Sequence, residues 1–318
     1  RDRKRPDTLK IPGSYTGRIC RGVYGLKDIP QSRGGQPLKV RAAAPACPAP
    51  SYQYSIITER NDKMRLRNKV AVVTGGANGI GRAIALRFAQ EGAVTVVVDR
   101  DEPNARETLS LIEKKGGTGF FVPADVSDRV QTDRMIETVI ERTKRVDILV
   151  TAAAIMERIS MLDCSKEDFA RTMDTNIHGV MNCVQGVIPC MKDQGRGKII
   201  IMSSLASVHG RAGYVAYAAA AGTLTGFTRN AAYRLGQFGI CVNGIAPGVI
   251  DTDFPESLKD EPEYREFRIR NTPLRRIGRP EDVVGTALFL STEDSDFVTG
   301  ETIVVDGGLS IYVNGIGQ

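Results

Sequence analysis

The chain has 318 residues, 42% of them hydrophobic and 25% charged, which is typical of a folded globular protein. No apolar run approaches the roughly 18 residues of a membrane-spanning helix, and the N-terminus lacks the apolar core of a secretory signal. We therefore expect a soluble, cytoplasmic protein without a membrane partner.

The excess of positive charge is confined to the N-terminus. Residues 1–66 hold 14 Lys and Arg against 5 Asp and Glu, whereas the rest of the chain holds 29 against 32. Residues 1–65 also lack helical or strand periodicity and include the Pro-rich run Ala42–Pro50, so we expect a basic extension with little structure. It is either a transit peptide, which would make the protein organellar, or a non-native leader upstream of a natural start at Met64. The remaining chain gives no reason to expect a nucleic-acid partner.

Residues 66–318 show a regular alternation of short runs rich in Val and Ile with longer amphipathic stretches. The runs predict seven strands, at Val70–Thr74, Val94–Val98, Gly119–Val122, Ile148–Thr151, Lys198–Ser203, Ile240–Ile245 and Thr302–Val305. Helices are expected between them, for example over Ile80–Glu91. Ser165 and Asp168 have the spacing of a capping box that opens a long helix toward Met191. This alternation predicts a single α/β domain, a Rossmann-type doubly wound parallel sheet whose ligand lies beyond the C-terminal ends of the strands.

A glycine-rich turn, Thr74–Gly81, follows the first predicted strand. Gly75, Gly79 and Gly81 let the backbone turn tightly and approach a pyrophosphate, whose charge would meet N–H groups at the start of the next helix. The position between a strand and a helix is the context that a dinucleotide site requires.

The second strand is followed by Asp99, eighteen residues after Gly81. A carboxylate there accepts hydrogen bonds from the adenosine ribose hydroxyls and repels a 2′-phosphate, so Asp99 favours NAD(H) over NADP(H). Arg100 is the counter-argument, because a guanidinium beside the ribose accommodates that phosphate.

From Leu66 to near Ser310, the chain resembles the classical short-chain dehydrogenase/reductase (SDR) family. The resemblance rests on six motifs in order, which are Thr74–Gly81, Asp125-Val126, Asn176, Ser204 thirteen residues before Tyr217, Pro247–Thr252 and Val305–Gly308. It implies the catalytic residues Asn176, Ser204 and Tyr217. It also implies dinucleotide contacts from Thr74, Gly75, Asn78, Gly79, Ile80, Gly81, Asp99, Asp125, Val126, Tyr217, Pro247, Gly248, Ile250 and Thr252.

The resemblance further implies an enzyme that interconverts an alcohol and a ketone on a small-molecule substrate. Tyr217 would exchange a proton with the substrate oxygen, which Ser204 would polarise. A free tyrosine has a pKa of about 10, and the family lowers it with a lysine four residues later. Family members usually form homodimers or homotetramers through the helices that bear the asparagine and the tyrosine.

The family pattern breaks at two places. Position 221 holds alanine where the family has lysine, and Thr151–Ala154 stands where it usually has Asn-Asn-Ala-Gly. If the lysine normally lowers the tyrosine pKa by about 3 units, its absence removes about 4 kcal/mol of phenolate stabilisation. We therefore expect turnover to fall by a factor on the order of 10³, with the fold and some NAD binding retained.

Three functions compete on this basis. The chain is an NAD-dependent oxidoreductase with impaired activity, or a catalytically inactive dinucleotide-binding subunit with a structural or assembly role. The third is an enzyme in which the alanines at 152, 220 and 221 were introduced by substitution.

The remaining reactive residues carry simpler interpretations. The six cysteines form no CxxC and there are only two histidines, so we expect reduced thiols and no metal. Met156, Met161 and Met202 are expected to line a core or pocket. The segment Phe254–Gly278 falls where family members carry a mobile lid, and its Leu258, Tyr264 and Phe267 are candidates to face the substrate.

Overall fold

The computed structural model describes residues 64–209, 213–252 and 262–311. Outside these residues lie positions 1–63 of the expected N-terminal extension, and Phe254 and Leu258 of the expected lid.

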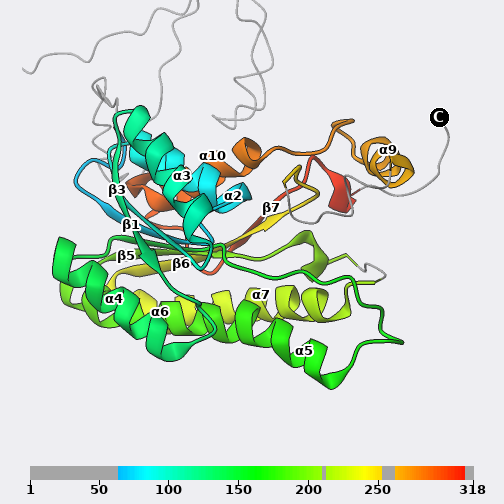
Figure 1. Ribbon diagram of the computed structural model, residues 1–318, viewed down its shortest axis with the longest axis horizontal. Helices are drawn as coiled ribbons and strands as arrows, with labels where there is room; N and C mark the ends of the chain where they lie inside the picture. The colour runs from blue at the N-terminus through cyan, green and yellow to red at the C-terminus, as the bar shows by residue number, and fades with distance from the viewer. Residues whose placement is uncertain (1–63, 210–212, 253–261, 312–318) are drawn as a thin grey trace, which may run out of the picture. The chain divides into compact units, whose positions relative to one another are not determined.

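Seven parallel strands form one sheet in the order β3-β2-β1-β4-β5-β6-β7 (Figure 1). The strands are β1 (Val70–Thr74), β2 (Val94–Asp99), β3 (Thr118–Pro123), β4 (Ile148–Thr151), β5 (Gly197–Met202), β6 (Ile240–Pro247) and β7 (Thr302–Val305). Every predicted strand is present, and its ends lie within two residues of the prediction. The predicted Rossmann-type sheet is confirmed.

Alternate side chains of the central strands enter two separate cores. In β1, Val70 and Val72 belong to one buried cluster, whereas Ala71 and Val73 belong to the other. Successive strand residues point to opposite faces, and here both faces are covered by helices. This is why the strands read as continuous apolar runs in the sequence.

Helices cover both faces of the sheet (Figure 1). One layer holds α2 (Gly79–Gln90), α3 (Glu102–Lys114) and α10 (Pro280–Ser291), and the other holds α4 (Arg129–Thr143), α6 (Gly179–Gln194) and α7 (Val215–Leu235). The shorter elements are α5 (Lys166–Met173), α9 (Pro262–Asn271) and the turns η1 (Asp174–His178), η2 (Leu205–Ser207), η3 (Gly236–Phe238), η4 (Glu293–Ser295) and η5 (Leu309–Ile311).

The helical segment that begins after Ser165 differs from the prediction in one respect. The capping box is confirmed, because Asp168 N donates to Ser165 Oγ at 3.0 Å and Ser165 N donates to the Asp168 carboxylate at 3.3 Å. The prediction of one regular helix toward Met191 is wrong, since the π-helical turn η1 separates α5 from α6. A π turn is wider than an α turn and is often found at functional sites. Here it carries Asn176, which is buried.

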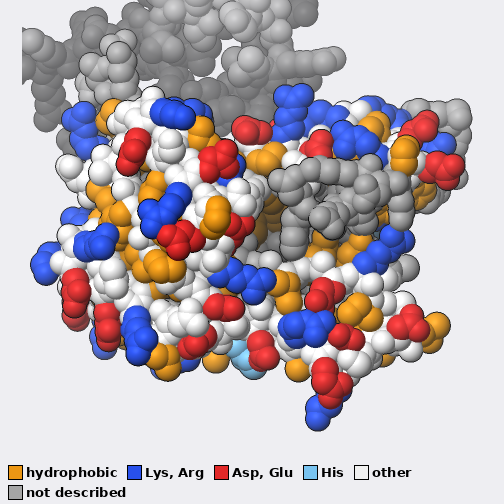
Figure 2. Space-filling view, in the orientation of Figure 1, with side chains coloured by type: hydrophobic (Ala, Val, Ile, Leu, Met, Phe, Trp, Pro, Cys, Tyr) orange, Lys and Arg blue, Asp and Glu red, His pale blue; other side chains and the backbone are white. Residues whose placement is uncertain are grey.

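Charges of both signs are interspersed on the described surface over α3 and α4 (Figure 2). Within the described residues, no helix combines the length and apolar character needed to cross a membrane.

Candidate active site

A cavity of about 290 Å³ lies at the C-terminal ends of the strands. The connections that follow β1 and β4 leave toward opposite faces of the sheet, which makes the space between these neighbours a topological switch point. The lining contains nearly all of the predicted site residues, namely Gly75, Asn78, Gly79, Ile80, Gly81, Asp99, Asp125, Val126, Asn176, Ser204, Tyr217, Pro247, Gly248, Ile250 and Thr252. Ala221 lines it as well.

Thr74 is the exception. Its side chain is buried, and its hydroxyl lies 3.4 Å from Ala153 N, which donates to it, and 3.5 Å from Val150 O. Thr74 therefore contacts the end of β4 and does not line the cavity.

The turn between β1 and α2 requires glycine for steric reasons. Gly75 has φ +67°, and a Cβ there would lie 2.6 Å from Ala153 N. A Cβ on Gly81 would collide with the carbonyl oxygen of Gly75. The turn thus folds tightly back on itself and against the end of β4.

The N-terminus of α2 faces the cavity without a side-chain cap. Asn78 is the N-cap residue but makes no capping hydrogen bond, and the first turn of the helix has no acidic residue. The first N–H groups of a helix have no partner within it, and they attract anions. This arrangement fits a pyrophosphate.

At the β2–β3 end of the cavity, Asp99 accepts hydrogen bonds from Ala77 N and Asp101 N, each at 3.1 Å. These bonds fix its carboxylate beside the glycine-rich turn. Arg100 pairs with Asp125 at 3.6 Å; the Arg100 side chain is exposed, and that of Asp125 is half-buried. Burial raises the pKa of Asp125, but hydrogen bonds from Ser127 and the neighbouring Arg100 outweigh it, so that this pKa lies below its usual value.

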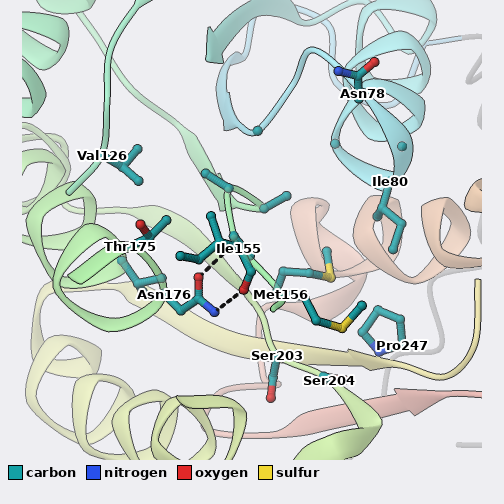
Figure 3. A pocket seen from close by; sticks show the side chains of 18 of the residues that line it. Asn78, Ile80, Val126, Ile155, Met156, Thr175, Asn176, Ser203, Ser204 and Pro247 are labelled. Carbon is teal, nitrogen blue, oxygen red and sulfur yellow. Dashed lines mark hydrogen bonds between the residues drawn. The ribbon is translucent and has the colours of Figure 1, made fainter. Parts of the chain in front are cut away.

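Asn176 holds the chain that follows β4. Its Oδ1 accepts from Ile155 N and its Nδ2 donates to Ile155 O, each at 2.9 Å (Figure 3). Both ends of the amide are thus engaged by one residue, which fixes the backbone at the centre of the cavity.

The β5–α7 side brings the predicted catalytic pair to the same cavity. Ser204 Oγ accepts from Ala206 N at 3.2 Å, which leaves its hydrogen for donation to another group. Tyr217 lies in the first turn of α7 and is half-buried. Ala221, one helical turn later, is buried, and its carbonyl accepts from Ser203 Oγ at 3.0 Å.

The bond from Ser203 to Ala221 was not predicted from the sequence. It ties the end of β5 to the helix that carries Tyr217. The only sequence signal was the pair of adjacent serines at the end of the strand. Successive residues of an extended chain point to opposite sides, so the two hydroxyl groups meet different partners.

Only some of the methionines and aromatic residues that were predicted to line a pocket do so. Met156 and Met202 line the cavity as expected, but the expectation for Met161 is wrong, because it is 76% exposed. Tyr264 and Phe267 of α9 are not among the lining residues.

The four described cysteines are free, and burial raises the pKa of the Cys183 thiol to about 12. Among the described residues, no cluster of His, Cys, Asp or Glu could hold a metal.

Comparison with known proteins assigns the domain to a family. A family model described as enoyl-(acyl carrier protein) reductase matches residues 75–310. The 3-oxoacyl-[acyl-carrier-protein] reductase FabG of Thermotoga maritima is 37% identical over 248 residues, which cover 78% of this chain and 100% of that protein. The (2S)-[(R)-hydroxy(phenyl)methyl]succinyl-CoA dehydrogenase subunit BbsD of Thauera aromatica is 34% identical over 249 residues, or 78% of this chain and 99% of that protein.

Solved structures agree with this assignment. The gluconate 5-dehydrogenase from Burkholderia cenocepacia J2315, in complex with NADP and tartrate, matches with a TM-score of 0.76 and 33% identity, covering 79% of this chain and 99% of that one. Levodione reductase matches with a TM-score of 0.76 and 29% identity, covering 78% of this chain and 100% of that one. These matches show that the chain belongs to the classical short-chain dehydrogenase/reductase family of oxidoreductases.

Proposed function

We propose that the chain is an NAD(H)-dependent oxidoreductase that interconverts an alcohol and a ketone, with turnover lowered by Ala221. The observation that carries this proposal is the shared cavity. Ser204 and Tyr217 line the same space as the glycine-rich turn and the uncapped N-terminus of α2. A dinucleotide on that turn would extend along the strand ends toward the serine and the tyrosine.

The chain's own residues account for the proton chemistry. A bound nicotinamide dinucleotide supplies the hydride donor or acceptor. Ser204 donates its hydroxyl hydrogen to the substrate oxygen and orients it. Tyr217 gives a proton to that oxygen during reduction and takes it back during oxidation.

Few cations line the described part of the cavity. Among the described lining residues, the only Lys or Arg is Arg100, which follows β2. Three strand spacings separate β2 from β5, or about 14 Å. Arg100 is therefore too distant to stabilise a phenolate at Tyr217.

The proposal is tested by assaying NADH oxidation with a panel of ketones and measuring NADH binding by calorimetry. Tyr217→Phe is expected to lower the residual turnover by about 10², since it removes the proton donor, and to leave NADH affinity within about twofold. Unchanged turnover in this variant would contradict the assigned role of the tyrosine.

The preference for NAD(H) rests on the fixed carboxylate of Asp99 at the end of β2. A 2′-phosphate beside it would meet a negative charge that two backbone N–H groups hold in place. Arg100 is already paired with Asp125, which reduces its attraction for a phosphate. The NADP-bound gluconate 5-dehydrogenase shows that a relative takes the phosphorylated cofactor, so the preference needs a direct test.

Asp99→Ser is expected to shift the ratio of NADPH to NADH affinity toward NADPH by about 30-fold, equivalent to about 2 kcal/mol. Calorimetric titration with both cofactors measures this ratio. Arg100→Ala is expected to change it in the opposite direction, by lowering the affinity for NADPH. Equal binding of NADPH and NADH by the unmodified chain would refute the NAD preference.

The second candidate function is a catalytically inactive subunit that binds the dinucleotide and serves assembly. Ala221 favours it, and so does the surface of α7, where the space around Gly222 and Gly226 is open to close approach by a second copy. This candidate predicts a homodimer or homotetramer that binds NADH and shows no turnover with or without a lysine at position 221.

A further inference from the structure

A second group of reactive side chains lies at the edge of the sheet opposite the cavity. Lys198 and Cys241 are the second residues of β5 and β6, whereas the cavity lies at the C-terminal ends of the strands. The two residues are direct partners in the parallel register. Such partners lie about 4.8 Å apart and point to the same face of the sheet. The lysine and the cysteine therefore share one place, remote from the site of the proposed function.

The ammonium group of Lys198 is held against the thiol of Cys241. Its Nζ donates to Cys241 Sγ at 3.6 Å and to Ser295 Oγ at 3.2 Å, and it pairs with Asp296 Oδ1 at 2.7 Å. Ser295 is fully buried, and the side chain of Lys198 is only 13% exposed. An ammonium group has three N–H donors, and these three partners engage all of them. The nitrogen is thus fixed beside the sulfur.

The sulfur of Cys241 is open to a small oxidant. Cys241 is a free, half-buried thiol whose Sγ also donates to Asp296 O at 3.6 Å. Cys190 is half-buried as well, and its Sγ donates to the amide oxygen of Gln194 at 3.3 Å. The two thiols have similar exposure and differ in the neighbouring group, so Cys190 provides an internal comparison.

We propose that hydrogen peroxide converts this pair into a covalent cross-link, an N–S bond between Lys198 and Cys241 that joins β5 to β6. The first step is oxidation of the sulfur. A cysteine thiolate attacks one peroxide oxygen, so that an S–O bond forms as the O–O bond breaks. The sulfur becomes a sulfenic acid and the peroxide is reduced to water.

The second step is condensation of the sulfenic acid with the lysine. A sulfenic acid reacts with a nitrogen that lies beside it. One proton of the Lys198 ammonium passes to the Asp296 carboxylate with which it is paired, and the amine then attacks the sulfur of Cys241. The N–S bond forms as the S–O bond breaks, and the leaving hydroxide takes a second proton from the nitrogen to become water. One peroxide is consumed, and the pair loses two hydrogen atoms.

Peptide mapping of the full chain tests the proposal. Reduced protein is treated with hydrogen peroxide, digested with trypsin in the absence of a thiol, and analysed by mass spectrometry. We expect trypsin not to cut after Lys198, because its side chain is no longer free. The product should join the peptide that begins at Gly197 to the peptide that contains Cys241, with the sum of their masses less two hydrogen atoms. Dithiothreitol should restore the two separate peptides, since a thiol attacks the sulfur of the N–S bond.

Two variants and an unfolded sample serve as controls. Lys198→Arg keeps a positive charge beside Asp296 but removes the amine, so it should abolish the cross-link. Cys190→Ser is the matched control and should leave its yield unchanged. In protein unfolded by urea, the yield should fall by at least about tenfold, because folding holds the two groups together. This last comparison uses the unmodified chain and does not depend on the folding of a variant.

The cross-link is also expected to stabilise the folded chain. It restricts the unfolded state, so the oxidised protein should melt about 5 °C or more above the reduced protein, and Cys241→Ser should show no such rise. Recovery of Cys241 only as a sulfinic acid or a disulfide, with normal cleavage after Lys198, would overturn the proposal. An equal yield in urea, a product that dithiothreitol leaves intact, or an unchanged melting temperature would overturn it as well.

Discussion

Replacing Ala221 by lysine is expected to raise kcat for ketone reduction by a factor on the order of 10³. Position 221 is buried, lines the cavity and follows Tyr217 by one helical turn on the same face of α7. A lysine ammonium there would lie near the tyrosine hydroxyl and stabilise its phenolate form. If the lysine lowers the pKa of Tyr217 by about 3 units, it stabilises the phenolate by about 4 kcal/mol.

Steady-state assays with NADH over a panel of ketones measure this gain, and a pH profile identifies its origin. The pH at which oxidation of the alcohol reaches half its maximum should fall by about 3 units in Ala221→Lys if the tyrosine pKa is the cause. Ala219→Lys is the matched control, because Ala219 lies on the exposed face of the same helix, two residues earlier. It adds the same charge and should leave kcat unchanged.

The absence of any gain in Ala221→Lys would decide between the candidate functions. If that variant folds, binds NADH and shows no turnover, the inactive-subunit interpretation stands and the assignment of an impaired enzyme fails. Brisk turnover by the unmodified chain would show instead that Tyr217 works without a neighbouring lysine.

The fold was predictable because its strands are buried on both faces. Each strand reads as a continuous apolar run, such as Val70–Val73, and such runs are hard to mistake when amphipathic helices separate them. The right-handed crossover rule then predicts helices on both faces of a parallel sheet, although it does not give the strand order. The cavity was predictable for the same reason, since parallel strands bring their C-terminal ends to one edge.

Hydrogen bonds between distant segments were not predictable. The sequence gives no sign that both ends of the Asn176 amide meet Ile155, or that Ser203 bonds to Ala221 O. Hydrophobic periodicity reports burial and does not report the partner of a polar group. The π turn that buries Asn176 escaped prediction because one wide turn barely disturbs a period of 3.6 residues.

Thr74 illustrates the limit of a motif. It belongs to the glycine-rich segment by sequence, but its hydroxyl contacts the backbone of the β4 end. A motif groups residues that are adjacent in the chain, whereas a binding site requires side chains or N–H groups that face one space. The role of Thr74 is therefore better described as positioning the turn.

Gly81→Ala is expected to be the most damaging single-methyl change at the cofactor end. The new Cβ would collide with Gly75 O, so either the turn must open or α2 must move. We expect a loss of about 3 kcal/mol of stability, or a melting temperature lower by about 6–12 °C. NADH affinity should fall by at least about 10², because the displaced turn no longer presents its N–H groups to the pyrophosphate.

Thermal unfolding and calorimetry with NADH measure the two effects, and a helical glycine elsewhere in the same layer provides the control. Gly285 lies within α10, and a Cβ there would meet nothing within 4 Å. Gly285→Ala should therefore leave NADH affinity unchanged and raise stability by up to about 1 kcal/mol, since alanine favours helix formation. If Gly81→Ala bound NADH as well as Gly285→Ala, the pyrophosphate could not lie against the turn that Gly75 and Gly81 form. The dinucleotide would then have to bind elsewhere in the cavity.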